Sequence, residues 1–186
     1  MIGKITLAGG AESDYYVDAR RALLRPTALL ACGELVAECA RKFGAVAVGG
    51  MSLGADPIAC GAIAVPAGAN LSAFFVRKER KSHGLQRWVE GPPLAPGTRC
   101  LVVEDVVTSG SSTVAAIEHI QEEGLEIVGV LSVVDRLAGG AEAIAAACDA
   151  PYHSLFTIDD LYPERPDASL RLDPLNYDNP IDPSIE

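Results

Sequence analysis

Aromatic side chains and positive charge are both scarce in this 186-residue chain. Only 5% of its residues are aromatic, and 15 Lys and Arg stand against 25 Asp and Glu, which gives a formal net charge of -10. Nucleic acids and anionic membranes bind to basic protein faces, so the composition argues against both as partners. An acidic chain can still bind phosphate groups if it concentrates its few cations in one place.

The sequence also lacks paired cysteines, a leader segment and a long apolar run. Its five cysteines contain no Cys-x-x-Cys pair, so we expect small core side chains in a reducing compartment, with no disulfide framework and no zinc site. Residues 1–10 lack the charged-then-apolar order of a signal peptide. The weakly polar run 57–76 is interrupted by Pro66, Gly68 and Asn70, which makes it a poor membrane span. We therefore expect a cytoplasmic protein.

Strand and helix signals alternate along most of the chain. The composition, 49% hydrophobic with 18 glycines, is typical of α/β proteins with alanine- and valine-rich layers. Continuous apolar strands separated by helices indicate a parallel sheet covered on both faces, so we expect an α/β fold with a central, mostly parallel five-stranded sheet flanked by helices. The expected helices are residues 27–43, 57–64, 114–123 and 142–148, and the expected strands are residues 45–48, 72–76, 100–103, 126–134 and 153–158.

Three segments do not follow this alternation. Residues 1–26 contain turn residues followed by Tyr-Tyr-Val, which predicts a loop and a short strand. Residues 84–97 form a long irregular connection of the kind that often serves as a lid or a binding loop. Residues 163–186 are rich in proline and are expected to be extended. We expect residues 1–162 to form one domain and residues 163–186 to form a tail.

Chemically distinctive residues follow four of the expected strands. Because the carboxyl ends of parallel strands meet at one edge of a sheet, where ligands of open α/β sheets bind, we expect these residues to converge. They are Gly49-Gly50, Arg77-Lys78, Glu104-Asp105 and Asp135-Arg136.

The most informative stretch runs from Arg99 to Thr113 and reads RCLVVEDVVTSGSST. Small residues at the entry to a helix let backbone N–H groups converge on a phosphate, although the same residues also suit a helix start capped by Ser111 or Ser112 without a ligand. The two carboxylates before this loop could receive sugar hydroxyls or hold Mg²⁺ through water. No lysine follows the glycine, so this is not the phosphate loop of nucleotide triphosphatases.

The segment VVEDVVTSGSST resembles the signature of type I phosphoribosyltransferases, which bind 5-phosphoribosyl 1-diphosphate (PRPP). The resemblance implies the type I phosphoribosyltransferase fold, with a small N-terminal hood that would correspond here to residues 1–26, reduced in size. It also implies that Glu104 and Asp105 contact the ribose hydroxyls. The residues implied to hold the 5-phosphate are Thr108, Ser109, Gly110, Ser111 and Ser112.

The run RKERKSHG, residues 77–84, contains four cations in five positions of an acidic chain. A charge run is ordinarily a solvated loop. Here it starts where a buried strand is expected to end, and it resembles the mobile-loop motif R-K-x-x-K-x-H-G of orotate phosphoribosyltransferases. That resemblance implies a homodimer whose lid loop reaches into the neighbouring subunit, with the diphosphate bound by Arg77, Lys78, Lys81 and His83.

Other segments resemble the same family. Residues 13–18, SDYYVD, match its S-x-Y-[YF]-x-[DN] segment, and Asp135-Arg136 followed by Gly139-Gly140 matches its arginine that contacts the orotate carboxylate. Residues 49–57 match a loop that lines the diphosphate. The residues implied to bind orotate are Tyr16, Thr108 and Arg136.

The resemblance implies an enzyme that transfers phosphoribosyl from PRPP to orotate, giving orotidine 5′-monophosphate and diphosphate in UMP biosynthesis. Lys81, His83 and Asp105 would be catalytic, and Mg²⁺ would bind through the diphosphate and water near Asp105, without direct protein ligands. Two alternatives stay open: a phosphoribosyltransferase for another base, and a non-catalytic regulator that binds PRPP. The regulator is suggested by Ala8 and Leu53, where many members carry lysine.

Three ring-bearing residues outside these motifs receive structural interpretations. His119 is expected at the surface of its helix and His153 at the start of a strand. Trp88 either packs the lid loop down or is an exposed loop aromatic.

Overall fold

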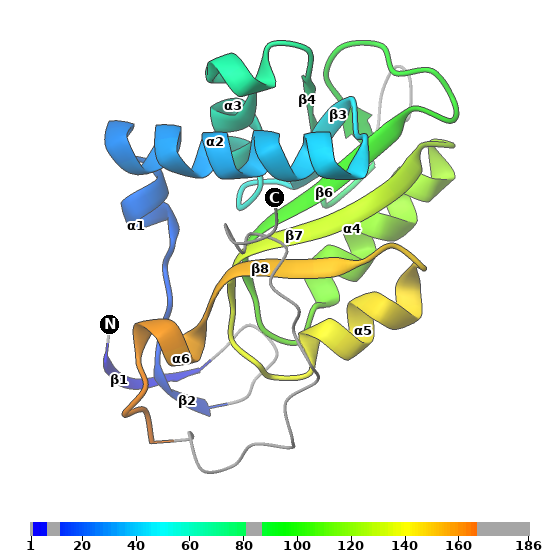
Figure 1. The fold of residues 1–186 in the computed structure, drawn as a ribbon. Coiled ribbons are helices and arrows are strands. Elements are labelled where there is room, and N and C mark those ends of the chain that lie inside the picture. Colours follow the sequence, from blue (N-terminus) through cyan, green and yellow to red (C-terminus); the bar gives the residue numbers. More distant parts are fainter. Residues whose placement is uncertain (1, 7–11, 81–86, 167–186) are drawn as a thin grey trace.

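The structure is a computed structural model, and it describes residues 2–6, 12–80 and 87–166. A six-stranded sheet has helices on both faces, and a two-stranded sheet lies beyond the ends of its strands (Figure 1). The order across the large sheet is β5-β4-β3-β6-β7-β8, with every pair parallel except β4 and β5. Its strands are β3 (Ala47–Met51), β4 (Ser72–Val76), β5 (Val89–Glu90), β6 (Arg99–Val107), β7 (Glu126–Asp135) and β8 (Tyr152–Thr157).

Two hydrophobic cores form because the central strands are apolar on both faces. One core joins the sheet to α2 and α3, with Val36 and Ile58 each 1% exposed. The other joins it to α4 and α5, with Ile117 and Ile144 fully buried. The helices are α1 (Arg20–Leu23), α2 (Pro26–Phe43), α3 (Asp56–Ala64), α4 (Ser111–Glu122), α5 (Gly140–Ala147) and α6 (Ile158–Leu161).

The longest helix, α2, has clear start and stop signals. Pro26 occupies the first helical position, where its missing N–H costs nothing. Gly44 ends the helix in the left-handed conformation, with φ of 65°, and its N–H donates to the carbonyls of Ala40 and Arg41. The predicted helix over residues 27–43 is confirmed.

The expected fold class is confirmed, but the sheet has six strands, where five were expected. The additional strand, β5, lies inside the connection interpreted as irregular and pairs antiparallel with β4, Val76 opposite Val89. A two-residue strand is too short to show alternation in a sequence, and only its pairing defines it. The single-turn helices α1 and α6 went unpredicted for the same reason.

The strand β6 is longer than predicted and includes both carboxylates. Its neighbour β7 is also long, and the pairing continues to Glu104 opposite Ser132 and Val107 opposite Asp135. Backbone hydrogen bonds make this ladder, so polar side chains do not end it. The acidic pair therefore occupies fixed strand positions.

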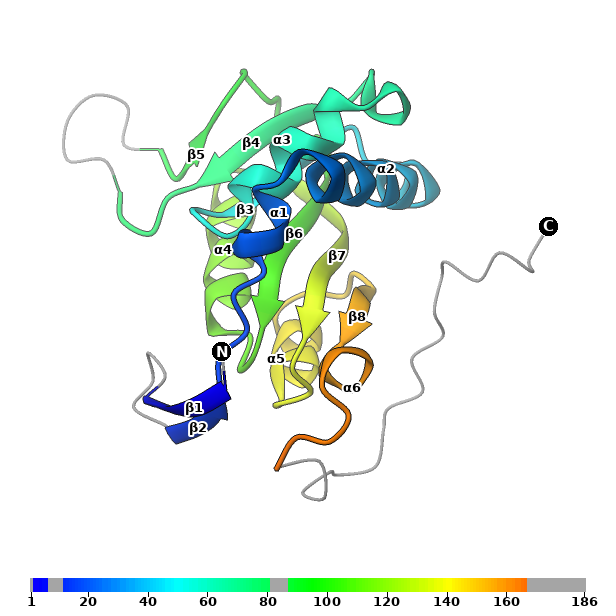
Figure 2. The same cartoon turned by 90° about the vertical axis from the view of Figure 1, so that its left-hand side faces the viewer.

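The N-terminal hood contains two antiparallel strands, β1 (Ile2–Thr6) and β2 (Glu12–Tyr15), where one short strand was expected. The hairpin lies beyond the carboxyl ends of β6 and β7 (Figure 2). It is thus placed to cover ligands bound at that edge. Within residues 2–6, 12–80 and 87–166, no helix combines the length and apolarity needed to cross a bilayer.

Candidate functional site

The four predicted groups of residues converge at the carboxyl edge of the sheet. The loop after β3 reaches the acidic pair, since a Cβ atom added at Gly54 would lie 2.6 Å from a Glu104 carboxylate oxygen. The N–H of Ser52 donates to the Val76 carbonyl at 2.9 Å, which joins that loop to the end of β4. The N–H of Arg136 donates to the Val107 carbonyl at 2.9 Å. The predicted convergence is confirmed.

The acidic pair is unequal in its surroundings. Glu104 is 5% exposed, and it accepts hydrogen bonds from the Asp105 N–H at 3.2 Å and from the Thr113 hydroxyl at 3.4 Å. Burial, together with the negative charge of Asp105, raises the pKa of Glu104 to about 8. The side chain of Asp105 is 17% exposed. One buried, proton-holding carboxyl group therefore stands beside a more accessible carboxylate.

Arg20 links the hood to this pair, and no motif predicted it. Its Nε lies 3.1 Å from Oδ1 of Asp18 and 3.8 Å from Oδ2 of Asp105. Its Nη2 donates to the Tyr16 hydroxyl at 3.5 Å. The hydrogen bond and charge of Asp18 raise the pKa of Arg20, and Asp105 adds to this. Arg20 thus connects Tyr16, four residues before it, with the acidic pair, and its contact with Asp105 exists only in the folded chain.

The small-residue loop leads directly into α4, which starts at Ser111, three residues earlier than predicted. Gly110 occupies the N-cap position with φ of 76°, and no side chain within the described ranges caps the helix. The alternative of a cap by Ser111 or Ser112 is therefore wrong. Ser109, Ser111 and Ser112 are exposed, so their hydroxyls and the first N–H groups of α4 can receive an anion.

Gly140 shapes this loop from the neighbouring segment. A Cβ atom there would lie 2.7 Å from the Thr108 carbonyl oxygen and would also meet the Val107 side chain. Any larger residue would push the two segments apart. Gly140 therefore allows the loop after β7 to pack closely on the small-residue loop after β6.

Arg136 is buried beneath the hood. It is 8% exposed, and its guanidinium carbon lies 4.5 Å from the centre of the Tyr15 ring. The fully buried Asp135 supports it, accepting hydrogen bonds from the Leu137 N–H at 2.7 Å and from the Tyr152 hydroxyl at 3.1 Å. Leu137 adopts a φ of 54°, a conformation that is costly for leucine. The Asp135 carboxylate thus holds the turn that places Arg136.

The described part of the cationic loop begins at β4. The N–H of Arg77 donates to the Trp88 carbonyl at 2.9 Å, and its Nη1 lies 3.4 Å from Oε1 of Glu90. Lys78 is exposed. The predicted site residues Lys81 and His83 lie outside the described residues, as does Ala8.

Trp88 packs against α4. Its ring stacks on His119 with centroids 3.5 Å apart, and its N–H and Nε1–H donate to Glu123 and Glu122, each at 2.7 Å. Arg80 pairs with Glu122 and lies over the Trp88 ring. His119, predicted at the helix surface, is half-buried because the indole covers its ring. A contact across 31 sequence positions leaves no local signal.

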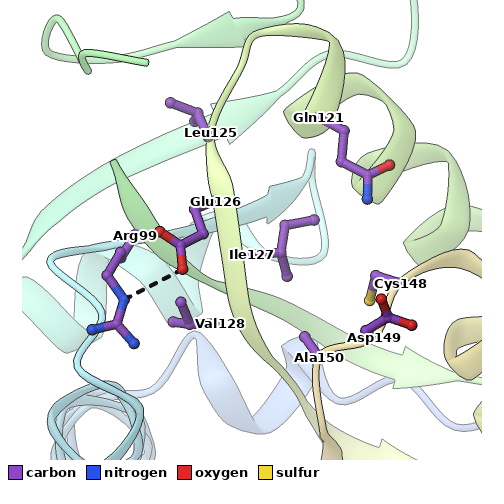
Figure 3. A pocket seen from close by; sticks show the side chains of 9 residues that line it. All are labelled: Arg99, Gln121, Leu125, Glu126, Ile127, Val128, Cys148, Asp149 and Ala150. Carbon is purple, nitrogen blue, oxygen red and sulfur yellow. Dashed lines mark ion pairs between the residues drawn. The ribbon is translucent and has the colours of Figure 1, made fainter. Parts of the chain in front are cut away.

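No group of three or more His, Cys, Asp or Glu suited to a metal occurs in the part of the chain that the structure describes. Glu104 and Asp105 offer the oxygen atoms that Mg²⁺ prefers. A hollow of about 510 Å³ lies at the opposite, amino end of β6 and β7 (Figure 3). Its lining includes the ion pair of Arg99 with Glu126, and it is remote from the acidic pair.

Comparison with known proteins agrees with this geometry. The family model of the phosphoribosyl transferase domain matches residues 24–151. The orotate phosphoribosyltransferase of Corynebacterium glutamicum (strain R) is 47% identical over 159 residues, 86% of this chain and 85% of that protein.

Solved structures are also similar. Mycobacterium tuberculosis H37Rv orotate phosphoribosyltransferase in complex with Fe(III) dicitrate has a TM-score of 0.75 and 45% identity, covering 87% of this chain and 90% of that one. The same protein in complex with PRPP has a TM-score of 0.70 and 42% identity, covering 78% and 82%.

Proposed function

Because the chain belongs to the orotate phosphoribosyltransferases within the phosphoribosyltransferase family, we propose that it transfers the phosphoribosyl group of PRPP to orotate. A bond forms between the orotate ring nitrogen and the anomeric carbon as the bond from that carbon to diphosphate breaks. Diphosphate leaves with the electron pair, the ring nitrogen gives up its proton to the departing diphosphate or to water, and orotidine 5′-monophosphate is the product. The observation that carries the proposal is the convergence of an acidic pair, an uncapped helix start and a buried arginine at one sheet edge.

The donor would lie along the loop from β6 to α4. The N–H groups at the start of α4 and the hydroxyls of Thr108, Ser109, Ser111 and Ser112 are suited to the 5-phosphate, with Gly110 allowing close approach. Asp105 would receive ribose hydroxyls and balance the positive charge that develops on the ribose as diphosphate departs. The Glu104 carboxyl group, which is more buried than that of Asp105, would also contact the ribose hydroxyls.

The leaving group would be stabilised by the cations that follow β4. Arg77 and Lys78 are placed at the carboxyl end of that strand. Lys81 and His83 follow in the same motif, and we propose that Lys81, His83 and Asp105 are the catalytic residues. Charge neutralisation of departing diphosphate, with exclusion of water, would account for most of the rate increase.

The acceptor would lie under the hood. The carboxylate of orotate needs a cation, and the buried guanidinium of Arg136 supplies one between Tyr15 and the turn at Asp135. Tyr16 would lie against the ring, positioned by its contact with Arg20, and Thr108 would contact the acceptor where it meets the donor. The charge of orotate lies on its carboxylate and is shared with the ring, and the departing diphosphate can accept the ring N–H proton, so we propose no strong general base.

We propose Mg²⁺ as the metal, held by the diphosphate and by water near Asp105. The oxygen atoms of Asp105 and Glu104 fit this ion, and two adjacent carboxyl groups favour a nearby cation. When bound, Mg²⁺ would offset the negative charge of the diphosphate. Asp105 would orient its water ligands.

We also propose a homodimer that shares the lid loop between subunits, cytoplasmic localisation, and a place in UMP synthesis. Mixing a Lys81→Ala subunit with an Asp105→Asn subunit tests the sharing. If each loop serves the neighbouring site, hybrid dimers contain one site with both defects and one intact site. Recovery of activity on mixing is then expected, and its absence would assign each loop to its own subunit.

The central experiment measures loss of orotate ultraviolet absorbance with the purified chain, PRPP and Mg²⁺. Turnover is expected, together with equimolar diphosphate. A panel of other bases identifies a different acceptor if orotate is not consumed. PRPP binding by calorimetry without turnover of any base would instead support the regulator.

A further inference from the structure

We propose that Tyr162 is a positioning residue for recognition of the base, because it holds Tyr15 against the guanidinium of Arg136. The inference rests on the proposed function, in which Arg136 receives the orotate carboxylate. Tyr162 follows α6 at the end of the main body, outside every motif described above. The Tyr162 ring contacts the Tyr15 ring, and the Tyr15 ring contacts the guanidinium of Arg136, which would bind the base.

The series begins with two ring contacts on Tyr15. The guanidinium carbon of Arg136 lies 4.5 Å from the Tyr15 ring centre. The Tyr15 and Tyr162 rings meet edge to face, with centroids 5.7 Å apart and planes at 88°. Tyr15 is 4% exposed. A guanidinium is attracted to the face of an aromatic ring, so the place of the Tyr15 ring helps to set the direction in which Arg136 points.

Tyr15 needs support from outside its own strand. It ends β2, which pairs with β1 in a separate two-stranded sheet. Among the described strands, no backbone ladder joins this hairpin to the six-stranded sheet. The contacts that Tyr15 makes with the body therefore help to set the position of the hood. The Tyr162 ring is one of them, and it acts on the same residue that covers Arg136.

Tyr162 itself is held firmly by α6. Its N–H donates to the carbonyl of Ile158, a residue that is 1% exposed in the core. The helix starts with a capping box between Thr157 and Asp160. The buried Arg165 pairs with Asp159, and its N–H donates to the Tyr162 carbonyl at 3.3 Å. A fixed ring on the body thus sets the position of a ring on the hood.

The test compares three variants in the orotate assay. Tyr162→Leu removes the ring, Tyr162→Phe keeps it, and Leu161→Ala changes the exposed neighbouring residue as a matched control. An edge-to-face pair is worth enough to alter binding about 3- to 10-fold. We expect Tyr162→Leu to raise the KM for orotate by about that factor while the KM for PRPP stays unchanged. Tyr162→Phe and Leu161→Ala should behave as wild type.

A double-mutant cycle shows whether the effect passes through Arg136. In an Arg136→Gln background, where the guanidinium is gone, Tyr162→Leu should change kcat/KM for orotate by less than about twofold. A further drop as large as that in the wild-type background would overturn the inference.

Other outcomes are equally decisive. Equal rises in the KM for both substrates, failure of Tyr162→Phe to restore orotate binding, or an identical defect in Leu161→Ala would show general loosening of α6 and overturn the proposal. If wild type converts orotate and Tyr162→Leu is unchanged, the inference fails while the proposed function stands. If wild type converts no orotate, both fail.

Discussion

Replacing Glu104 with glutamine should make the protein more stable at alkaline pH and remove a pH dependence that wild type shows. Glu104 is 5% exposed and adjoins Asp105, and this environment raises its pKa from 4.5 to about 8. Between these two pH values the native state keeps a proton that the unfolded chain releases. The free energy of unfolding of wild type must therefore fall as pH rises through this interval.

The size of the effect follows from the same pKa values. Each pH unit over which the two states differ by one proton changes the unfolding free energy by about 1.4 kcal/mol, so the interval from 4.5 to about 8 corresponds to at most about 5 kcal/mol. We expect a change of about 2–4 kcal/mol in wild type between pH 5 and pH 8, relative to Glu104→Gln.

The assay is urea unfolding followed by circular dichroism at pH 5, 6, 7 and 8, with EDTA present. Other groups that titrate in this range, such as the partly buried His153 with its lowered pKa, affect both proteins and cancel in the difference. Asp105→Asn is the matched variant, and it should reduce the slope because it removes a charge that raises the pKa of Glu104. Parallel stability curves for wild type and Glu104→Gln would refute the reasoning.

Three further predictions concern the loops around the site. Trp88→Phe keeps a ring on α4 but loses the hydrogen bond to Glu122, so thermal unfolding should show a loss of about 1 kcal/mol; no change would mean that this exposed bond adds nothing. Gly140→Ala places a methyl group against the Thr108 carbonyl and should raise the KM for PRPP about tenfold or more, with unchanged PRPP affinity as the contrary result. Lys81→Ala should lower kcat by about 100-fold or more; an unchanged kcat would remove this lysine from the mechanism.

Much of the site could be predicted because its signals are local. The carboxylates of Glu104 and Asp105 stand at the end of an apolar run, and the loop to Ser112 is made of small residues followed by helical spacing. Such features depend on the conformational preferences of residues that are neighbours in the sequence, so they can be identified without the tertiary structure. Alternation of strands and helices then requires a parallel sheet, and a parallel sheet brings strand ends to one edge.

The tertiary structure decided what depends on distant residues. Two-residue β5 exists only because β4 lies beside it. Arg20 contacts Asp105, and Trp88 stacks on His119. The partners in each contact are far apart in the sequence, so no local pattern predicts them.

The protonation of Glu104 is another property that depends on distant residues. The residue types of the acidic pair are visible in the sequence, but burial raises the pKa of Glu104, and burial results from packing against Gly54 and Thr113. Likewise, Arg136 is evident as a residue, while the Tyr15 and Tyr162 rings that hold it come from opposite ends of the chain. Sequence determined which chemical groups reach the sheet edge because the residues that directly follow each strand are fixed along the chain. The fold determined their orientation and protonation because both depend on what surrounds them in space.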